Sequence, residues 1–231
     1  MIATVNIADL GARRTLRSLW HRPAPANVSG LRWLDTAVAV PLASKRPPGL
    51  RRSVMIAFWD DEEAAAAFAE DHPLGQRYAE NGFRAVLSPL RAFGTWPGLP
   101  DDLPRARAAA HEGPVLVTTL ARLRVTQAGP FFRASRPAER SAVAAAGFVW
   151  GTAASRFPFF MATVSLWSSG EAAAGYAYGD PDAGHPRAIT EQRRKDFHHE
   201  SAFIRFAPLG ITGSVRGMPA TDSRNNPAHP E

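Results

Sequence analysis

The amino-acid sequence contains one pattern twice. Residues 53–69 form an apolar run ending in tryptophan and followed by an alanine-rich stretch, and residues 161–177 repeat this pattern. Residues 88–98 likewise match residues 207–217. The first match is offset by 108 positions (161 minus 53) and the second by 119 (207 minus 88), so the second copy carries 11 additional residues between the matches. The chain is therefore expected to fold as two related units, with any specialised chemistry in the enlarged copy.

Each copy reads as strand, helix, strand, strand, helix, strand. Alternating or continuous apolar runs predict the strands, helical spacing of apolar residues predicts the helices, and proline and glycine mark the connections. In the first copy the elements are expected at 2–8, 10–20, 34–42, 54–59, a helix opened by Asp60 with Glu63, and 84–96. In the second they are expected at 115–125, a helix that includes 138–146, 148–153, 160–167, and a helix opened by the capping pair Ser168 and Glu171.

This order of elements predicts an α+β fold made of two ferredoxin-like βαββαβ units, each an antiparallel sheet with both helices on one face. Such a sheet needs cover on its second face, and two copies in one chain can place these faces against each other. We therefore expect an intrachain pseudo-dimeric α+β barrel with a partly polar cavity inside. The expected units are 1–98 and 114–218, with a linker at 99–113 and a disordered tail at 219–231.

Composition excludes several kinds of site. The 231 residues include no cysteine, which rules out disulfides, thiolate nucleophiles, iron–sulfur clusters and cysteine-bound zinc. The sequence has neither a signal-peptide pattern nor about 18 consecutive apolar residues, so a soluble, cytoplasmic protein is expected. The net charge of +6 comes from scattered arginines, which predicts no nucleic-acid binding. It is consistent with surface solubility, with attraction to anionic membrane surfaces, and with an acidic protein partner.

The enlarged copy gains polar residues that the first copy lacks. Residues 178–206 contain three of the seven histidines, His185, His198 and His199, together with Arg205. Histidine, arginine and aromatic side chains near a barrel mouth can supply an axial iron ligand, an anchor for a carboxylate and the walls of an apolar pocket. Each histidine also has a structural interpretation, because His198 or His199 can cap a helix end and His185 can lie in a surface loop.

Arg205 is flanked by Ile204 and Phe206 in an expected strand. An arginine that faces a sheet interior is costly unless it is paired, so we expect it to meet a carboxylate, an anionic ligand group or water. Aromatic residues are core residues by default, and pocket lining is a second role for four of them: Trp150, Trp167, Phe197 and Phe203.

Four segments of the second copy stand out: residues 160–167 (FMATVSLW), 176–179 (YAYG), 184–189 (GHPRAI) and 197–206, which end in FIRF. The first copy adds Thr36-Ala37-Val38, Phe58-Trp59 and Gly94-Thr95-Trp96. Together these segments resemble the spheroidene monooxygenase family of carotenoid biosynthesis. The resemblance covers nearly the whole chain except the tail.

This resemblance implies a monooxygenase that uses haem and dioxygen, receives electrons from a ferredoxin and oxidises a lipophilic, acyclic carotenoid. It further implies a haem between the two sheets, with one of His185, His198 and His199 as the axial iron ligand. Arg205 would bind a haem propionate or act with His199 on bound oxygen. Peripheral contact with a membrane is compatible with such a substrate.

Two other functions fit the residues. The chain can be a cofactor-free barrel that binds, carries or senses a small apolar molecule, with its histidines on the surface. It can also be a cofactor-independent oxygenase or a haem-degrading enzyme, for which haem is the substrate. Separate substitution of the three histidines distinguishes these readings, because only a haem enzyme should lose its spectrum with one of them.

Overall fold

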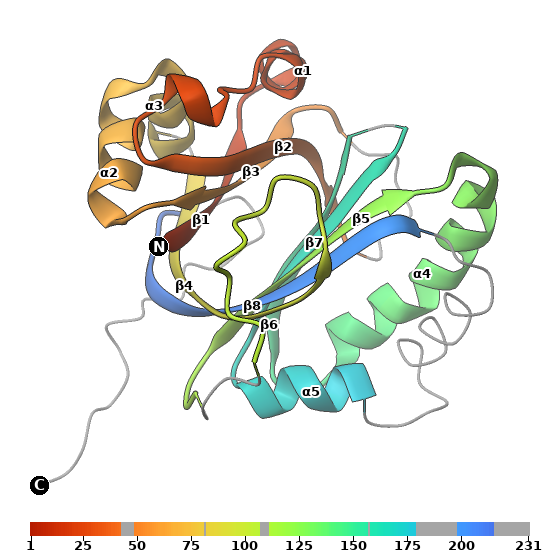
Figure 1. The fold of residues 1–231 in the computed structure, drawn as a ribbon. Helices are drawn as coiled ribbons and strands as arrows, with labels where there is room; N and C mark the ends of the chain where they lie inside the picture. The colour runs from red at the N-terminus through yellow and green to blue at the C-terminus, as the bar shows by residue number, and fades with distance from the viewer. Residues whose placement is uncertain (43–48, 81, 107–110, 157, 179–197, 215–231) are drawn as a thin grey trace, which may run out of the picture.

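Eight strands close into one antiparallel barrel, as Figure 1 shows. The computed structural model describes residues 1–42, 49–80, 82–106, 111–156, 158–178 and 198–214. The strands are β1 (Ile2–Asp9), β2 (Leu31–Pro41), β3 (Arg52–Trp59), β4 (Gly82–Thr95), β5 (Val115–Leu123), β6 (Phe148–Arg156), β7 (Phe160–Trp167) and β8 (His198–Thr212). The described helices are α1 (Ala12–Trp20), α2 (Glu62–Asp71), α3 (Pro73–Glu80), α4 (Ala128–Ala144) and α5 (Gly170–Tyr178), with 3₁₀ turns at Pro25–Asn27 and Val125–Gln127.

The strand order confirms the predicted fold class. Around the barrel the order is β1-β3-β2-β6-β7-β5-β8-β4, so the first half contributes β4-β1-β3-β2 and the second β8-β5-β7-β6. Both halves have the ferredoxin-like order, with the helices outside the barrel (Figure 1). The two sheets meet at two seams, β2 with β6 and β4 with β8.

The same glycine turn precedes the second strand of each half. Gly30 and Gly147 both have positive φ, and a Cβ at either position would overlap an alanine of the following helix, Ala64 or Ala172. The Gly30 carbonyl accepts from the Asp60 N–H, and the Gly147 carbonyl accepts from the Ser168 N–H, each at 2.8 Å. Glycine is needed here for both reasons, its backbone conformation and the close approach.

This turn explains why both predicted helix caps are wrong by one residue. The backbone N–H groups of Asp60 and Ser168 are hydrogen-bonded to this turn, before the helix begins. The next residue therefore caps the helix in each half. Asp61 accepts from the Ala64 N–H at 2.8 Å, and Ser169 Oγ accepts from the Ala172 N–H at 3.1 Å.

Helix α3 was not predicted from the sequence. It packs against α2 so closely that a Cβ on Gly75 would overlap the Phe68 carbonyl. A glycine inside an eight-residue helix weakens the sequence signal, and tertiary packing outweighs that cost here. Its Leu74 and Tyr78 are buried against β1 and β4, so α3 covers the outer face of the first sheet.

Apolar side chains fill the barrel interior. The described residues that point inward are mainly apolar, whereas a partly polar cavity was expected there. Inward-facing residues of all eight strands build one buried cluster. Phe58 contacts Trp33 and Phe206 with ring centroids 6.0 Å apart, and Phe83 meets Trp150 at 4.7 Å. Where these rings meet, the interior is packed by side chains of both sheets.

Charged side chains bind across the seam between β2 and β6. The buried Asp35 on β2 accepts from Arg156 Nη1 and Nη2 on β6, the latter at 3.1 Å, and from Arg22 Nη1 at 2.8 Å. The Thr36 N–H donates to the same carboxylate at 2.8 Å. Burial raises the pKa of Asp35 to about 6, against the opposing effects of Arg22 and the Thr36 N–H. The carboxylate and its cations thus link the two halves.

Candidate functional site

The outer face of the first sheet is closed. Thr4, Asn6, Ser53 and Met55 lie on this face and are all buried beneath the helices. Trp59 Nε1 donates to Thr4 Oγ1 at 2.9 Å. The Tyr78 hydroxyl donates to Ser53 Oγ at 2.6 Å, and burial raises the pKa of Tyr78 far above its usual range. These polar groups satisfy one another, so this face is a structural core.

The outer face of the second sheet is only half covered. Val117, Thr119, Thr163, Ser165 and Phe203 lie on this face, and each keeps part of its surface exposed. The strand register aligns them in two rows across β7, β5 and β8. Helix α4 packs mainly on β6 and α5 on β7. Residues 179–197, which follow α5 in the sequence, lie outside the described residues.

An aromatic layer closes one end of this half-covered face. Trp167 stacks on Tyr176 with centroids 5.0 Å apart and meets Phe148 edge-on at 5.4 Å. Trp167 Nε1 donates to Ser165 Oγ at 2.9 Å, and the Tyr176 hydroxyl donates to the Ala138 carbonyl at 3.0 Å. The face is therefore apolar at the α5 end and carries hydroxyl groups further along the strands.

Two arginines lie side by side at the seam between β4 and β8. Arg205 on β8 is directly opposite Arg91 on β4, and both side chains are half-buried. Because Ile204 and Phe206 point into the barrel, Arg205 points outward, which corrects the expectation that it faces the sheet interior. A Cβ on Gly170 would lie 4.0 Å from Arg205 Nη1, so the guanidinium reaches the first turn of α5.

Neither arginine has an ion-pair partner among the described residues. Of the ion pairs in this part of the chain, none includes Arg91 or Arg205. The Arg91 Nε is buried and makes no hydrogen bond to a described residue. Like charges directly opposite in a sheet are unfavourable, and an unpaired buried donor adds a further cost. The N-terminal turn of α5 adds partial positive charge. The arrangement is suited to an anionic group.

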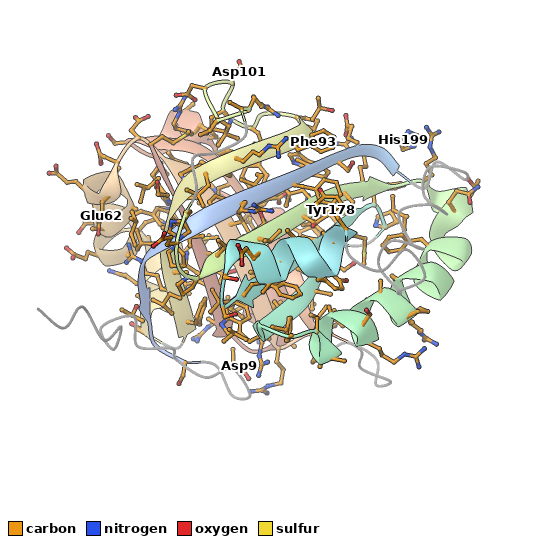
Figure 2. All side chains as sticks on the ribbon, turned by 90° about the horizontal axis from the view of Figure 1, so that it is seen from below. Asp9, Glu62, Phe93, Asp101, Tyr178 and His199 are labelled. Carbon is orange, nitrogen blue, oxygen red and sulfur yellow. The ribbon has the colours of Figure 1, made fainter. Side chains whose placement is uncertain are left out.

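The predicted histidines are not gathered at these arginines. His185 lies outside the described residues. His198 begins β8, where its backbone is opposite Leu123, and its side chain is not among those that the structure describes. His199 is exposed, and Figure 2 shows it at the far end of β8 with its side chain directed away from the barrel. His199 and Arg205 are six positions apart along β8, about 20 Å.

The four predicted pocket aromatics do not share one face. Trp150 points into the barrel, and its buried Nε1 has no hydrogen-bond partner among the described residues. Trp167 and Phe203 lie on the outer side, where Phe203 contacts Phe93 with centroids 6.4 Å apart. Phe197 lies outside the described residues. Trp167 and Phe203 thus belong to the half-covered face, whereas Trp150 belongs to the barrel core.

Arg91 was not identified as a candidate site residue from the sequence. It follows the Pro89-Leu90 pair that aligns with Pro208-Leu209, where the second copy has Gly210. Its only sequence signal is that difference between copies. What makes Arg91 notable is the register of β4 with β8, which shifts between Pro89 and Arg91 and brings it opposite Arg205.

Comparison with known proteins identifies a relative of known activity. No family model matches the sequence. Spheroidene monooxygenase from Rubrivivax gelatinosus is 35% identical over 177 residues, which are 74% of this chain and 66% of that protein. The chain is a homologue of spheroidene monooxygenase. The family resemblance predicted from residues 160–206 is thereby confirmed, and the match spans just under two thirds of the relative's length.

Solved structures of low sequence identity are also similar to the chain. An aldoxime dehydratase (OxdRE) in complex with butyraldoxime is 9% identical, with a TM-score of 0.54, covering 90% of this chain and 79% of that one. A heme-degrading enzyme from Listeria monocytogenes is 12% identical with a TM-score of 0.31, covering 88% of this chain and 98% of that one. The first similarity supports the barrel fold alone.

Proposed function

We propose that this protein is a monooxygenase of lipophilic, carotenoid-like substrates that binds haem on the outer face of its second sheet. The observation that carries the proposal is the 35% identity with spheroidene monooxygenase. It is combined with the half-covered outer face of the second sheet, since the corresponding face of the first sheet is buried. A monooxygenase places one oxygen atom of O₂ in a substrate C–H bond and reduces the other to water with two electrons and two protons. A ferredoxin-type protein is the proposed electron donor.

Haem fits the outer face better than the barrel interior. Haem is a flat apolar ring with two carboxylates, and the interior is filled by contacting aromatic rings. The outer face spans β7, β5 and β8, strands about 4.8 Å apart, and ends at Arg91 and Arg205, which have no ion-pair partner among the described residues. Arg91 and Arg205 would hold the carboxylates by charge-assisted hydrogen bonds. When bound, haem would supply the binding and activation of O₂.

This placement limits the choice of iron ligand. If Arg205 holds a haem carboxylate, the backbone of His198 is about 23 Å away along β8, a span that the arginine side chain, the haem and the histidine side chain would have to bridge together. His199 is nearly as far and is exposed. Within this proposal His185 is the first candidate for the iron ligand, with His198 and His199 as the alternatives.

The residues around this face have separate proposed tasks. Thr119 and Thr163, neighbours across β5 and β7, present hydroxyls that can hold water or orient a bound oxygen species. Phe203 and Phe93 give an apolar flank on which an isoprenoid chain can lie. Trp167 and Tyr176 exclude water at the α5 end.

The test is an absorption spectrum of the protein produced with a haem precursor, recorded before and after dithionite and carbon monoxide. We expect a Soret band that shifts on reduction and disappears in one histidine variant, His185→Ala first. The Arg205→Gln variant should bind hemin about tenfold more weakly, because one charge-assisted hydrogen bond is lost. Arg136→Gln, at an exposed position on α4, is the matched control and should not change hemin affinity.

A colourless protein that also ignores added hemin would overturn the haem assignment. The cofactor-free barrel that binds an apolar molecule would then be the better account. Retention of carotenoid oxidation by a haem-free preparation would instead keep the activity and remove the cofactor.

A further inference from the structure

Helix α1 presents an exposed surface that is both apolar and basic. Its buried side consists of Thr15, Ser18 and Leu19, which face the sheet. On the outward side Trp20 is 82% exposed and Leu16 is 41% exposed. Arg13 and Arg17 are exposed beside them on the same side of the helix, which follows from the helical period. Among the described residues, no ring contact or hydrogen bond includes the exposed Trp20 side chain.

A cavity next to this surface is lined by cations. Its volume is about 170 Å³, and it lies between α1 and α3. The lining includes five basic side chains, Arg14, Arg17, His21, His72 and Arg77, together with Ser18, and no carboxylate is among the described residues that line it. The described ion pairs include none of the three arginines.

His72 is held as a donor towards this cavity. Its Nδ1 accepts from the Leu74 N–H at 3.1 Å, and its ring stacks on Phe68 with centroids 4.5 Å apart. Burial and the nearby Arg77 lower the pKa of His72, so the neutral ring carries its proton on Nε2. The cavity therefore offers hydrogen-bond donors from Arg14, Arg17, Arg77 and His72, which suits a phosphate group.

We propose that the α1 surface, defined by Arg13, Leu16, Arg17 and Trp20 with the cavity beside it, docks on an anionic phospholipid membrane. Trp20 and Leu16 would enter the interface, where tryptophan is favoured, and a lipid phosphate would occupy the cavity. The arginines of this surface would add electrostatic attraction to the anionic headgroups. Free phosphate would explain the cavity, but it would leave the exposed Trp20 and Leu16 without a role.

The position of α1 suits this role. Figure 1 shows α1 on the side of the barrel opposite α5, so docking leaves the second sheet's outer face accessible. Among the described helices none has both the length and the apolar character of a membrane span, so contact would be peripheral. The inference does not require haem, and it extends the proposed function because a membrane is where a carotenoid dissolves.

The experiment is co-sedimentation of the full chain, without haem, with vesicles of phosphatidylcholine alone or mixed with phosphatidylglycerol. We expect binding to the mixed vesicles only, weakening with added salt. The double variant Arg14→Gln, Arg17→Gln should bind about 30-fold more weakly, since two arginines contribute about 2 kcal/mol. Trp20→Ser should also reduce binding several-fold.

The double variant Arg136→Gln, Arg140→Gln is the matched control. It removes two exposed arginines from α4 and changes the net charge equally. Equal loss with this control would show attraction by net charge and overturn the proposal. Unchanged binding of Trp20→Ser would also overturn it, as would absence of binding to the mixed vesicles. Because no haem is present, none of these results depends on the proposed monooxygenase activity.

Discussion

The two seams of the barrel carry opposite arrangements of charge. At the seam between β2 and β6, a buried carboxylate, Asp35, is held by Arg156 and Arg22. At the seam between β4 and β8, Arg205 is opposite Arg91, and neither has a carboxylate partner among the described residues. The pseudo-twofold symmetry of the fold exchanges β2 with β6 and β4 with β8, so it maps each seam onto itself and leaves the two seams free to differ in their side chains.

This difference shows which seam is built for the fold alone. The Asp35 seam satisfies its own charges and requires nothing from outside. The arginine seam has repulsion that an anion would remove, and it borders the half-covered face of the second sheet. The asymmetry of charge at the seam between β4 and β8 thus adjoins the asymmetry of cover on the second sheet, where the proposed chemistry lies.

The largest effect is expected from breaking the compensated seam. Arg156→Met removes the bidentate partner of Asp35 and the contact of its guanidinium with the Phe160 ring, 5.0 Å from the centroid. The free energy of unfolding should fall by about 3 kcal/mol at pH 7, because a buried carboxylate loses its main cation. Urea unfolding followed by circular dichroism measures this change.

Arg32→Met is the matched control for this substitution. Arg32 also forms an ion pair, at 2.8 Å with Asp102, but the Asp102 side chain is 60% exposed. An exposed pair contributes less than about 1 kcal/mol. Equal losses for the two variants would show that the Asp35 seam is no more important than a surface pair.

The second effect is the pH dependence of the Asp35 seam. The pKa of Asp35 is about 6 in the folded chain and lower in the unfolded chain, so the folded state binds more protons between about pH 4 and pH 6. The free energy of unfolding should therefore fall by about 2 kcal/mol as pH rises through this window, and then level off. In Arg156→Met the fall should continue to higher pH. A wild-type stability that rises through the window, after subtraction of an Asp35→Asn profile, would contradict this sign.

Much of the fold could be predicted from the sequence because it depends on local patterns. The central strands, such as Phe160–Trp167, appear at their predicted positions since alternation of apolar residues specifies them directly. Helix α3 escaped prediction because its stability comes from packing on α2. The caps moved from Asp60 and Ser168 to the next residues because of hydrogen bonds to Gly30 and Gly147, which are distant in sequence.

The site could be predicted only in part. Arg205 was identified because an arginine between Ile204 and Phe206 is unusual in a strand, but its direction depended on which face is the interior. Arg91 could not be found, because its proximity to Arg205 results from a register shift in β4. The roles of His185, His198 and His199 remain predictions.

The smallest effect is expected at the arginine seam, and its sign is opposite to that of the first prediction. In the haem-free chain Arg205→Gln should raise the free energy of unfolding by about 0.5 kcal/mol, because it relieves cross-strand repulsion with Arg91. Arg205→Glu should raise it by up to about 1 kcal/mol, since it offers Arg91 a carboxylate. Parallel urea titrations at low salt measure both changes.

The same two variants should lose affinity for hemin, Arg205→Glu most of all. Greater stability together with weaker ligand binding is the behaviour of a residue retained for function, because a purely structural arginine would lose stability when replaced. If Arg205→Glu destabilises the haem-free chain, Arg205 has a partner within the protein, and the contrast between the two seams does not hold. If it stabilises the chain and hemin affinity is unchanged, the contrast holds and the seam serves a different anion.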